Sequence, residues 1–144
     1  MKEDALFCVG QKALIEKDGK VLVLDPVVRL DYPGGKIQED EAQDGEAASL
    51  NRALQREVRE ETGLEIEVGD PFVVWYHQFD GNHRNSGKKV YLVAFRCKYV
   101  SGELQLSDEH DNFRWVDAND YQQVDDGSDY FDVLEKYFQS SRDL

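Results

Sequence analysis

Three glutamates crowd the end of one predicted helix, and this crowding constrains the chain more than any other feature. Glu57, Glu60 and Glu61 are spaced i, i+3 and i+4, and Gly63 follows where the helix should end. Residues at this spacing share a helix face, so the like charges repel one another. The negative end of the helix dipole disfavours them further. The arrangement therefore predicts a bound cation of the kind that carboxylates and water hold octahedrally, Mg²⁺ or Mn²⁺.

The alternative is that these acids form an ordinary solvated helix face. The flanking residues argue against it, because Pro33-Gly34-Gly35 and Arg56-Glu57 accompany the pair Glu60-Glu61 and the terminal Gly63. This combination resembles the signature of the Nudix hydrolase family. In that signature, a glycine and a later glutamate precede Arg-Glu-apolar-any-Glu-Glu-any-Gly-apolar.

Residues 56–64 match the second half of the signature at every position, and Gly35 followed by Glu41 matches the first half. The join differs, because fourteen residues separate Glu41 from Arg56 where the family has seven. Gly45-Glu46 is an alternative match for the glycine-glutamate step. The surplus residues could lengthen the helix by about two turns with little change of phase. The polar, acidic run 38–46 favours a longer loop before the helix instead.

The resemblance implies a single Nudix domain over residues 1–144, an α/β/α sandwich with a mixed central sheet. It also implies hydrolysis of a pyrophosphate bond in a nucleoside diphosphate linked to another group, with Mg²⁺ or Mn²⁺ as cofactor. The metal ligands it implies are Gly35 through its carbonyl, Glu57, Glu60 and Glu61. Glu57 is alternatively the base that orients water, and Glu60 and Glu109 complete the expected catalytic set. Arg56 is expected to orient the motif by pairing with Glu41 or Glu46.

Substrate recognition is harder to predict from the sequence. Arg84 and Lys88 lie in a basic loop that could guide phosphates, and Tyr32 lies near the expected substrate mouth. Trp75, with the neighbouring aromatics, is either a base-stacking residue or part of the core. His110 either contacts phosphate or stacks on Trp115, and stacking is favoured.

The substrate class remains open at this stage. The resemblance allows nucleoside triphosphates (oxidised or not), ADP-ribose, nucleotide sugars and dinucleoside polyphosphates. We favour a nucleoside triphosphate, because the chain lacks the additional signatures of several other substrate classes. The alternative is a Nudix-like module that binds a nucleotide for regulation without cutting it. The intact glutamates Glu57, Glu60 and Glu61 argue against that alternative.

Composition limits the partners. The net charge of −13 disfavours a nucleic-acid polymer, whose binding depends on neutralising phosphates, but it does not exclude a small nucleotide. No apolar run approaches the roughly 18 residues of a membrane span, and the N-terminus does not resemble a signal peptide, so we expect a cytoplasmic protein. Cys8 and Cys97 lie in apolar runs and are expected to be core thiols. The resemblance allows a homodimer.

Periodicity predicts the order of the elements. An apolar strand over 6–15 and a second over 20–24 flank an Asp18-Gly19 turn, which is typical of a hairpin. The helix bearing the acids follows, with a buried stripe of Ala47, Leu50, Leu54 and Val58. Further strands are predicted over 65–68, 71–76, 90–99, 103–106 and 113–116. A C-terminal helix from Tyr130 carries an apolar face of Phe131, Leu134, Tyr137 and Phe138.

Overall fold

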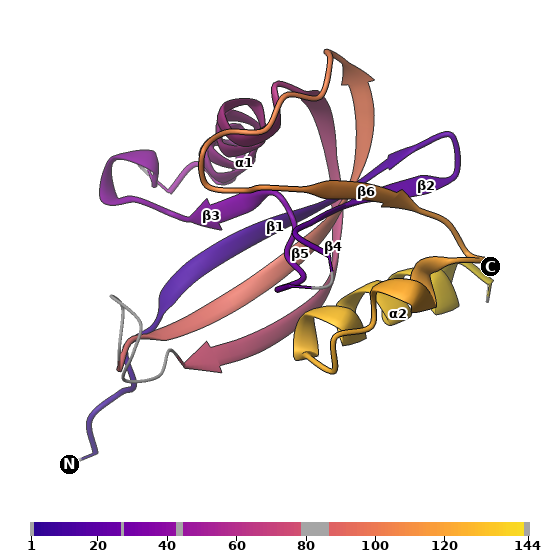
Figure 1. Ribbon diagram of the computed structural model, residues 1–144. Helices are drawn as coiled ribbons and strands as arrows, with labels where there is room; N and C mark the ends of the chain where they lie inside the picture. The colour runs from indigo at the N-terminus through magenta and orange to yellow at the C-terminus, as the bar shows by residue number, and fades with distance from the viewer. Residues whose placement is uncertain (1, 27, 43–44, 79–86, 143–144) are drawn as a thin grey trace.

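The computed structural model describes residues 2–26, 28–42, 45–78 and 87–142, and its centre is a mixed six-stranded sheet (Figure 1). The strands run in the order β4-β5-β1-β2-β6, and β3 pairs with β1 beside β2. The strands are β1 (Cys8–Lys17), β2 (Lys20–Leu24), β3 (Gly34–Lys36), β4 (Glu65–Gln78), β5 (Lys89–Ser101) and β6 (Phe113–Val116). The helices are α1 (Ala47–Thr62) and α2 (Asp129–Arg142), with short 3₁₀ turns η1 (Glu39–Glu41) and η2 (Tyr121–Val124).

Strand β1 lies at the centre of this sheet and organises it. Along one edge it pairs in parallel with β5, and along the other it pairs antiparallel with β2 and then β3. The predicted hairpin between β1 and β2 is confirmed. Asp18 and Gly19 both have positive φ angles, 53° and 78°, which suit the tight turn of a twisted hairpin. Gly34 at the start of β3 is thereby brought opposite Lys12.

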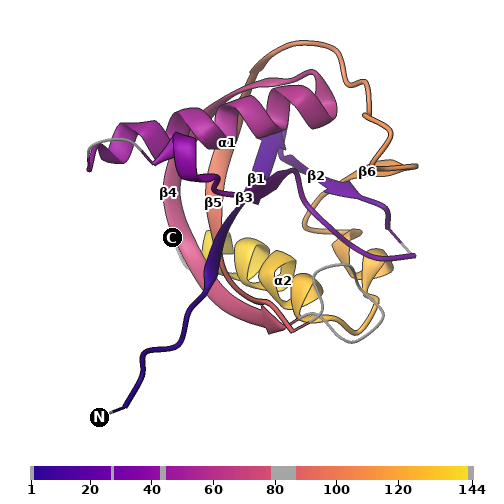
Figure 2. The ribbon, with the colours of Figure 1, turned by 90° about the vertical axis from the view of Figure 1, so that its left-hand side faces the viewer.

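The two long helices cover opposite faces of the sheet, as Figure 2 shows. One buried cluster lies beneath α1 and includes Ile15, Leu54 and Val58. The other lies beneath α2 and includes Leu14 and Leu134. Because β1 sends successive side chains to opposite faces, its neighbours Leu14 and Ile15 contribute to both clusters. The α/β/α sandwich with a mixed sheet is therefore confirmed.

The strand predictions needed three corrections. The predicted strands 65–68 and 71–76 are one bulged strand, β4, with register shifts on both sides of Pro71, which has no backbone N–H to donate. The predicted strand 103–106 is wrong, because that segment lies against the end of α1 instead. The short strand β3 was not predicted.

The helix predictions were more accurate. The α2 side chains expected in the core (Phe131, Leu134, Tyr137 and Phe138) are all buried. Of the predicted stripe on α1, Leu54 and Val58 are buried, Leu50 is half-buried and Ala47 in the first turn is exposed. No helix among the described residues is long and apolar enough to cross a membrane.

The two cysteines differ in environment. Cys97 is buried, and burial raises the pKa of its thiol to about 12, as expected for an inert core thiol. The prediction for Cys8 was wrong, because this residue is exposed at the start of β1. Its apolar neighbours Phe7 and Val9 also keep about two-fifths of their surface exposed, so the apolar run there does not indicate burial.

Candidate active site

Helix α1 ends as the sequence predicts. Gly63 adopts the left-handed conformation with φ of 75°, and its N–H donates to the carbonyl of Arg59 at 2.8 Å. The last two turns carry the three acids, and their exposure differs widely. Glu61 is only 6% exposed, whereas the Glu60 side chain is 57% exposed and that of Glu57 is 23% exposed. The three carboxylates therefore occupy distinct environments on one helix end.

Glu61 is a buried carboxylate held against β3. Its Oε2 accepts the backbone N–H of Gly34 at 3.0 Å. Burial raises the pKa of Glu61 to about 7, while this hydrogen bond and the nearby Lys12 ammonium act in the opposite direction. Lys12 itself forms an ion pair with Asp31 at 3.0 Å. A cation bound beside Glu61 would favour the ionised form of its carboxyl group.

Gly34 and Gly35 let the backbone approach these groups closely. Gly34 has φ of 141°, and a Cβ there would lie 2.0 Å from the carbonyl oxygen of Gln11. A Cβ on Gly35 would lie 3.2 Å from the carboxylate of Glu57. A glycine is therefore sterically required at position 34, where the contact is with backbone, whereas at position 35 a side chain would only crowd the flexible Glu57 carboxylate. Both glycines bring β3 close to Glu57 and Glu61.

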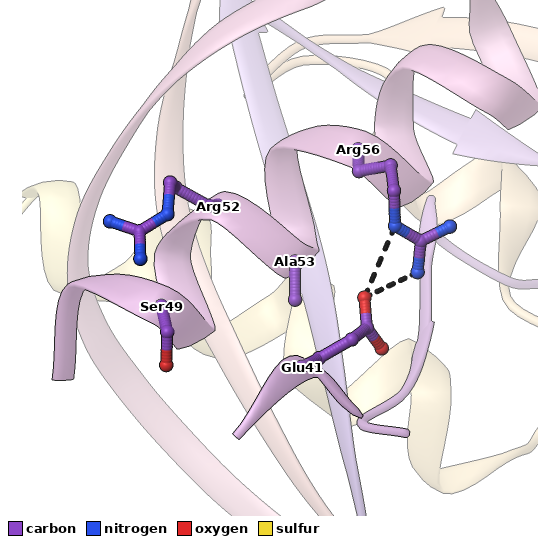
Figure 3. A pocket seen from close by; sticks show the side chains of 5 residues that line it. All are labelled: Glu41, Ser49, Arg52, Ala53 and Arg56. Atoms are coloured by element: carbon purple, nitrogen blue, oxygen red, sulfur yellow. Dashed lines mark hydrogen bonds and ion pairs between the residues drawn. The ribbon is translucent and has the colours of Figure 1, made fainter. Parts of the chain in front are cut away.

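Arg56 joins the loop before α1 to the helix through its contacts with Glu41 (Figure 3). Its guanidinium donates to Glu41 through Nε at 3.1 Å and through a second, shorter contact. It also donates to both oxygens of Glu60, at 2.8 and 2.9 Å, and to Glu57 at 3.3 Å. Burial opposes the charge on Glu41, but the hydrogen bonds from Arg56 and from the Gln38 backbone lower its pKa.

The structure separates the two matches for the motif glutamate. Arg56 pairs with Glu41, whereas Glu46 pairs with Arg52 at 3.3 Å, where both side chains are more than half exposed. The residues between Glu41 and Arg56 comprise a segment up to Glu46 and the first turns of α1, which begins at Ala47. The loop is thus longer, as the polar run 38–46 predicts.

The segment after β5 brings further ligand candidates to Glu61. Ser107 N–H donates to the carbonyl of Glu61 at 2.9 Å, and Gln105 N–H donates to that of Thr62. A carboxylate oxygen of Glu61, one of Glu109 and a ring nitrogen of His110 all lie within 4.8 Å of one another. This is the one group of its kind found among the described residues.

His110 is held by a residue that the sequence analysis missed. Its Nδ1 lies 2.6 Å from Oδ2 of Asp25, and Oδ1 of Asp25 accepts the N–H groups of Asp111 and Asn112. The structure thus pairs His110 with Asp25, where the sequence favoured stacking on Trp115. Burial opposes ionisation of Asp25, but these hydrogen bonds lower its pKa. No local pattern identifies Asp25, because its partners are some 85 residues away in the chain.

The acids predicted to share one metal site therefore fall into two groups. Glu57 and Glu60 gather around Arg56 with Glu41, whereas Glu61 lies with Glu109 and His110. The donor atoms of the second group suit a divalent cation, because they combine carboxylate oxygens with an imidazole nitrogen. The buried Glu61 carboxylate also has a raised pKa that a cation would offset. The residues present fit a divalent-metal site.

The residues predicted to contact the substrate lie in different environments. Tyr32 is fully buried, stacks on Tyr130 and donates its hydroxyl to the Tyr130 carbonyl at 2.5 Å, so it presents no surface to a substrate. Lys88 is exposed beside Phe7, where a depression of about 320 Å³ opens, and Arg84 lies outside the described residues. Trp75 packs edge-on against Tyr130, and its buried Nε1–H has no hydrogen-bond partner among the described residues.

Comparison with known proteins gives consistent matches. Residues 12–137 match the model of the NUDIX domain family. The chain is 35% identical over 109 residues to a CTP pyrophosphohydrolase of Escherichia coli (strain K12), covering 72% of this chain and 70% of that protein. A MutT-like protein of Streptomyces ambofaciens is 27% identical over 72% of this chain and 58% of its own length. The crystal structure of a MutT protein from Methanosarcina mazei Go1 superposes with a TM-score of 0.74 at 26% identity, covering 99% of this chain and 100% of that one.

Proposed function

Because this chain belongs to the Nudix hydrolase family and is a pyrophosphohydrolase of nucleotide-linked substrates, we propose that it acts on a nucleoside triphosphate with Mg²⁺ or Mn²⁺. The products would be a nucleoside monophosphate and pyrophosphate. The geometry around Glu61 carries the proposal, since a buried carboxylate stands beside Glu109 and His110 at the end of the motif helix. The similarity to the Escherichia coli CTP pyrophosphohydrolase supports a triphosphate over the other substrates that the family uses.

Glu61, Glu109 and the Gly35 carbonyl would hold the ion. Glu60 would join them by exchanging its contact with Arg56 for the ion, and Glu57 would serve either as a ligand or as the base. When bound, a divalent cation neutralises charge that builds up on the phosphate oxygens. The position of Glu61 is set by the N–H of Gly34 and by its place in the last turn of α1. A rigid ligand of this kind keeps the ion in a fixed place relative to the substrate.

Glu57 is suited to accept a proton from the attacking water. Burial raises the pKa of Glu57, and the negative charges of Glu60 and Glu41 add to this effect, while Arg56 opposes it. A carboxylate with a raised pKa is a better base than an ordinary one. Glu109 is the alternative base, because it lies exposed beside Glu61.

Arg56 would fix the positions of the acids without contacting the substrate. Its three carboxylate partners lie on η1 and α1, so one planar guanidinium sets the spacing between the loop and the helix. Such a role explains why the motif requires arginine at this position. Lysine would supply the charge without the fork of donors.

Trp75 is our candidate for contact with the nucleobase, in place of Tyr32. Its Nε1–H is buried and lacks a partner among the described residues. The side chain as a whole is only half-buried, unlike that of Tyr32, so a nucleobase could stack on its exposed part. Lys88 and Arg84 remain proposed contacts for the phosphates.

The test is a panel of substrates assayed with Mg²⁺ or Mn²⁺. It would include nucleoside triphosphates, ADP-ribose, nucleotide sugars and dinucleoside polyphosphates, and would measure the products released. Glu61→Gln is compared with Glu65→Gln, which removes an exposed carboxylate that pairs with Arg59 just beyond the helix. We expect triphosphates to yield pyrophosphate with the native chain and with Glu65→Gln. With Glu61→Gln we expect a loss on the order of 10²-fold or more.

Two outcomes would overturn the proposal. Preferred cleavage of ADP-ribose or a nucleotide sugar would reject the triphosphate. Equal losses in Glu61→Gln and Glu65→Gln would remove Glu61 from the site, because both variants lose one negative charge near the same helix end.

A further inference from the structure

The segment that carries Glu109 and His110 is attached to the rest of the protein on both sides of these residues. Before them, the Ser107 N–H donates to the carbonyl of Glu61 at 2.9 Å. After them, the N–H groups of Asp111 and Asn112 donate to Asp25 at 2.9 and 3.2 Å, and Asp25 N–H donates to the Asn112 carbonyl at 2.8 Å. His110 is thus held close to Glu61.

Asp25 also determines which nitrogen of His110 carries a proton. Its carboxylate already accepts two backbone N–H groups through Oδ1, and Oδ2 lies 2.6 Å from Nδ1 of His110. A carboxylate can only accept a hydrogen bond, so Nδ1 must be the protonated nitrogen. Neutral His110 then carries its lone pair on Nε2. Metal-binding histidines are commonly oriented in this way by a carboxylate on the other nitrogen.

We propose that His110 is a nitrogen ligand of the divalent cation, together with Glu61 and Glu109, and that Asp25 positions it for this role. The inference rests on the proposed function, and it concerns the choice of ion at the same site. Imidazole suits the later first-row transition ions such as Co²⁺, whereas Mg²⁺ and Mn²⁺ prefer oxygen ligands. The site would therefore favour Co²⁺ over Mg²⁺.

The geometry is compatible with direct coordination. Ligand atoms lie about 2.0–2.2 Å from such ions, so two ligands of one ion lie at most about 4.4 Å apart. A ring nitrogen of His110 and one carboxylate oxygen from each of Glu61 and Glu109 already lie within 4.8 Å of one another. Glu109 is exposed, whereas Glu61 and the His110 side chain are largely buried, so Glu109 is the ligand best able to move toward the other two.

A purely structural role for His110 makes a different prediction, and two substitutions separate the roles. His110→Asn keeps an N–H in reach of Asp25 but removes the Nε2 ligand. Asp25→Asn keeps an oxygen to accept the backbone N–H groups, but its amide N–H faces Nδ1 and moves the imidazole proton to Nε2. The control is Asp120→Asn, which alters a carboxylate that accepts a loop N–H of Asp117 at 2.7 Å and lies outside this cluster.

The decisive readout is nitrogen coordination in the full chain without substrate. Pulsed EPR of bound Mn²⁺ reports a coupling to ¹⁴N when an imidazole binds, and calorimetry gives the affinities for Co²⁺ and Mg²⁺. We expect the coupling in the native chain and in Asp120→Asn, and its loss in His110→Asn and Asp25→Asn. We also expect those two variants to bind Co²⁺ about 10–100-fold more weakly, with a much smaller change for Mg²⁺.

Absence of the nitrogen coupling in the native chain would overturn the proposal, as would equal changes in Co²⁺ and Mg²⁺ affinity in His110→Asn. Neither result depends on catalysis. If nitrogen coupling were present but no triphosphate were cleaved, the proposed function would fail while the assignment of His110 would stand. If triphosphates were cleaved without nitrogen coupling, the proposed function would stand while the assignment of His110 would fail.

Discussion

Glu61 is ionisable, largely buried and stabilised by one backbone hydrogen bond. Its environment opposes the charge that metal binding requires, since burial raises its pKa to about 7 from an ordinary value of 4.5. A bound cation reverses that balance, because it favours the ionised form. The residue is therefore costly to the metal-free protein at neutral pH and useful to the metal-bound one.

This conflict predicts a specific pH dependence of stability without metal. Between pH 4.5 and 7 the unfolded chain has released a proton that folded Glu61 still holds. The free energy of unfolding should therefore fall as pH rises through this window, by about 3 kcal/mol in total. Glu61→Gln should lack this decrease and should be at least as stable as the native chain above neutral pH.

Urea unfolding with a chelator, at about pH 5 and about pH 8, measures the effect. The difference in the free energy of unfolding between pH 5 and pH 8 should be larger in the native chain than in Glu61→Gln. Glu65→Gln serves as the control and should behave like the native chain. Identical pH dependence in all three proteins would contradict the burial argument.

At the scale of elements, the site depends on how η1 and β3 dock on α1. Arg56 joins η1 to the helix, and the N–H of Gly34 joins β3 to it. Glu41 and Glu46 offer a matched comparison, because each pairs with an arginine of α1. Only the Glu41 pair is partly buried, with 11% of the Glu41 side chain exposed.

We predict that Glu41→Gln lowers the free energy of unfolding by about 1–2 kcal/mol, since it weakens a partly buried, charge-assisted contact. It should also lower turnover, because Arg56 then holds Glu57 and Glu60 less firmly. Glu46→Gln should change stability by less than about 0.5 kcal/mol. Urea unfolding and steady-state kinetics of both variants check this. Similar effects of the two substitutions would show that the loop does not depend on Glu41.

The accuracy of the sequence predictions follows the range of the interactions involved. Helix α1, its end at Gly63 and the β1–β2 hairpin were predictable, because periodicity and turn residues are local. Strand β3 was not, since three residues pair only because β1 lies beside them. The single strand β4 was hidden by Pro71, and β5 maintains its pairing across the bulge.

The site shows the same division. The position of the acids at the end of α1 was predictable from their spacing, and so was the close approach of the glycine pair, but the division of the acids into two groups was not. Asp25 was not, because its contact with His110 exists only in the folded chain. Tyr32 was predicted to lie near the substrate mouth. Its ring is instead buried in the core, where its hydroxyl donates to the Tyr130 carbonyl.

Over the whole molecule, the net charge of −13 disfavours the compact state through self-repulsion. A divalent cation bound at Glu61 should therefore stabilise the protein more than a non-binding salt of equal ionic strength does. By mass action, an ion at a hundred times its dissociation constant adds about 2.7 kcal/mol. We predict that Mn²⁺ raises the melting temperature of the native chain well beyond NaCl of equal ionic strength. Glu61→Gln should lose most of this difference, and an equal rise with both salts would argue against a specific site.

The segment from Gln105 to Ser107 is attached to α1 through main-chain atoms, by N–H groups that donate to the carbonyls of Thr62 and Glu61. Every residue except proline can supply such a donor, so these bonds place little demand on the side chains. The signature helix and the neighbouring loop are thus free to diverge separately. The helix that carries the signature can be kept while the residues at positions 109 and 110 change, and under our proposal such a change would alter which ion the site prefers. For the same reason, a protein engineer could replace the short segment that carries positions 109 and 110 while leaving the signature helix unchanged.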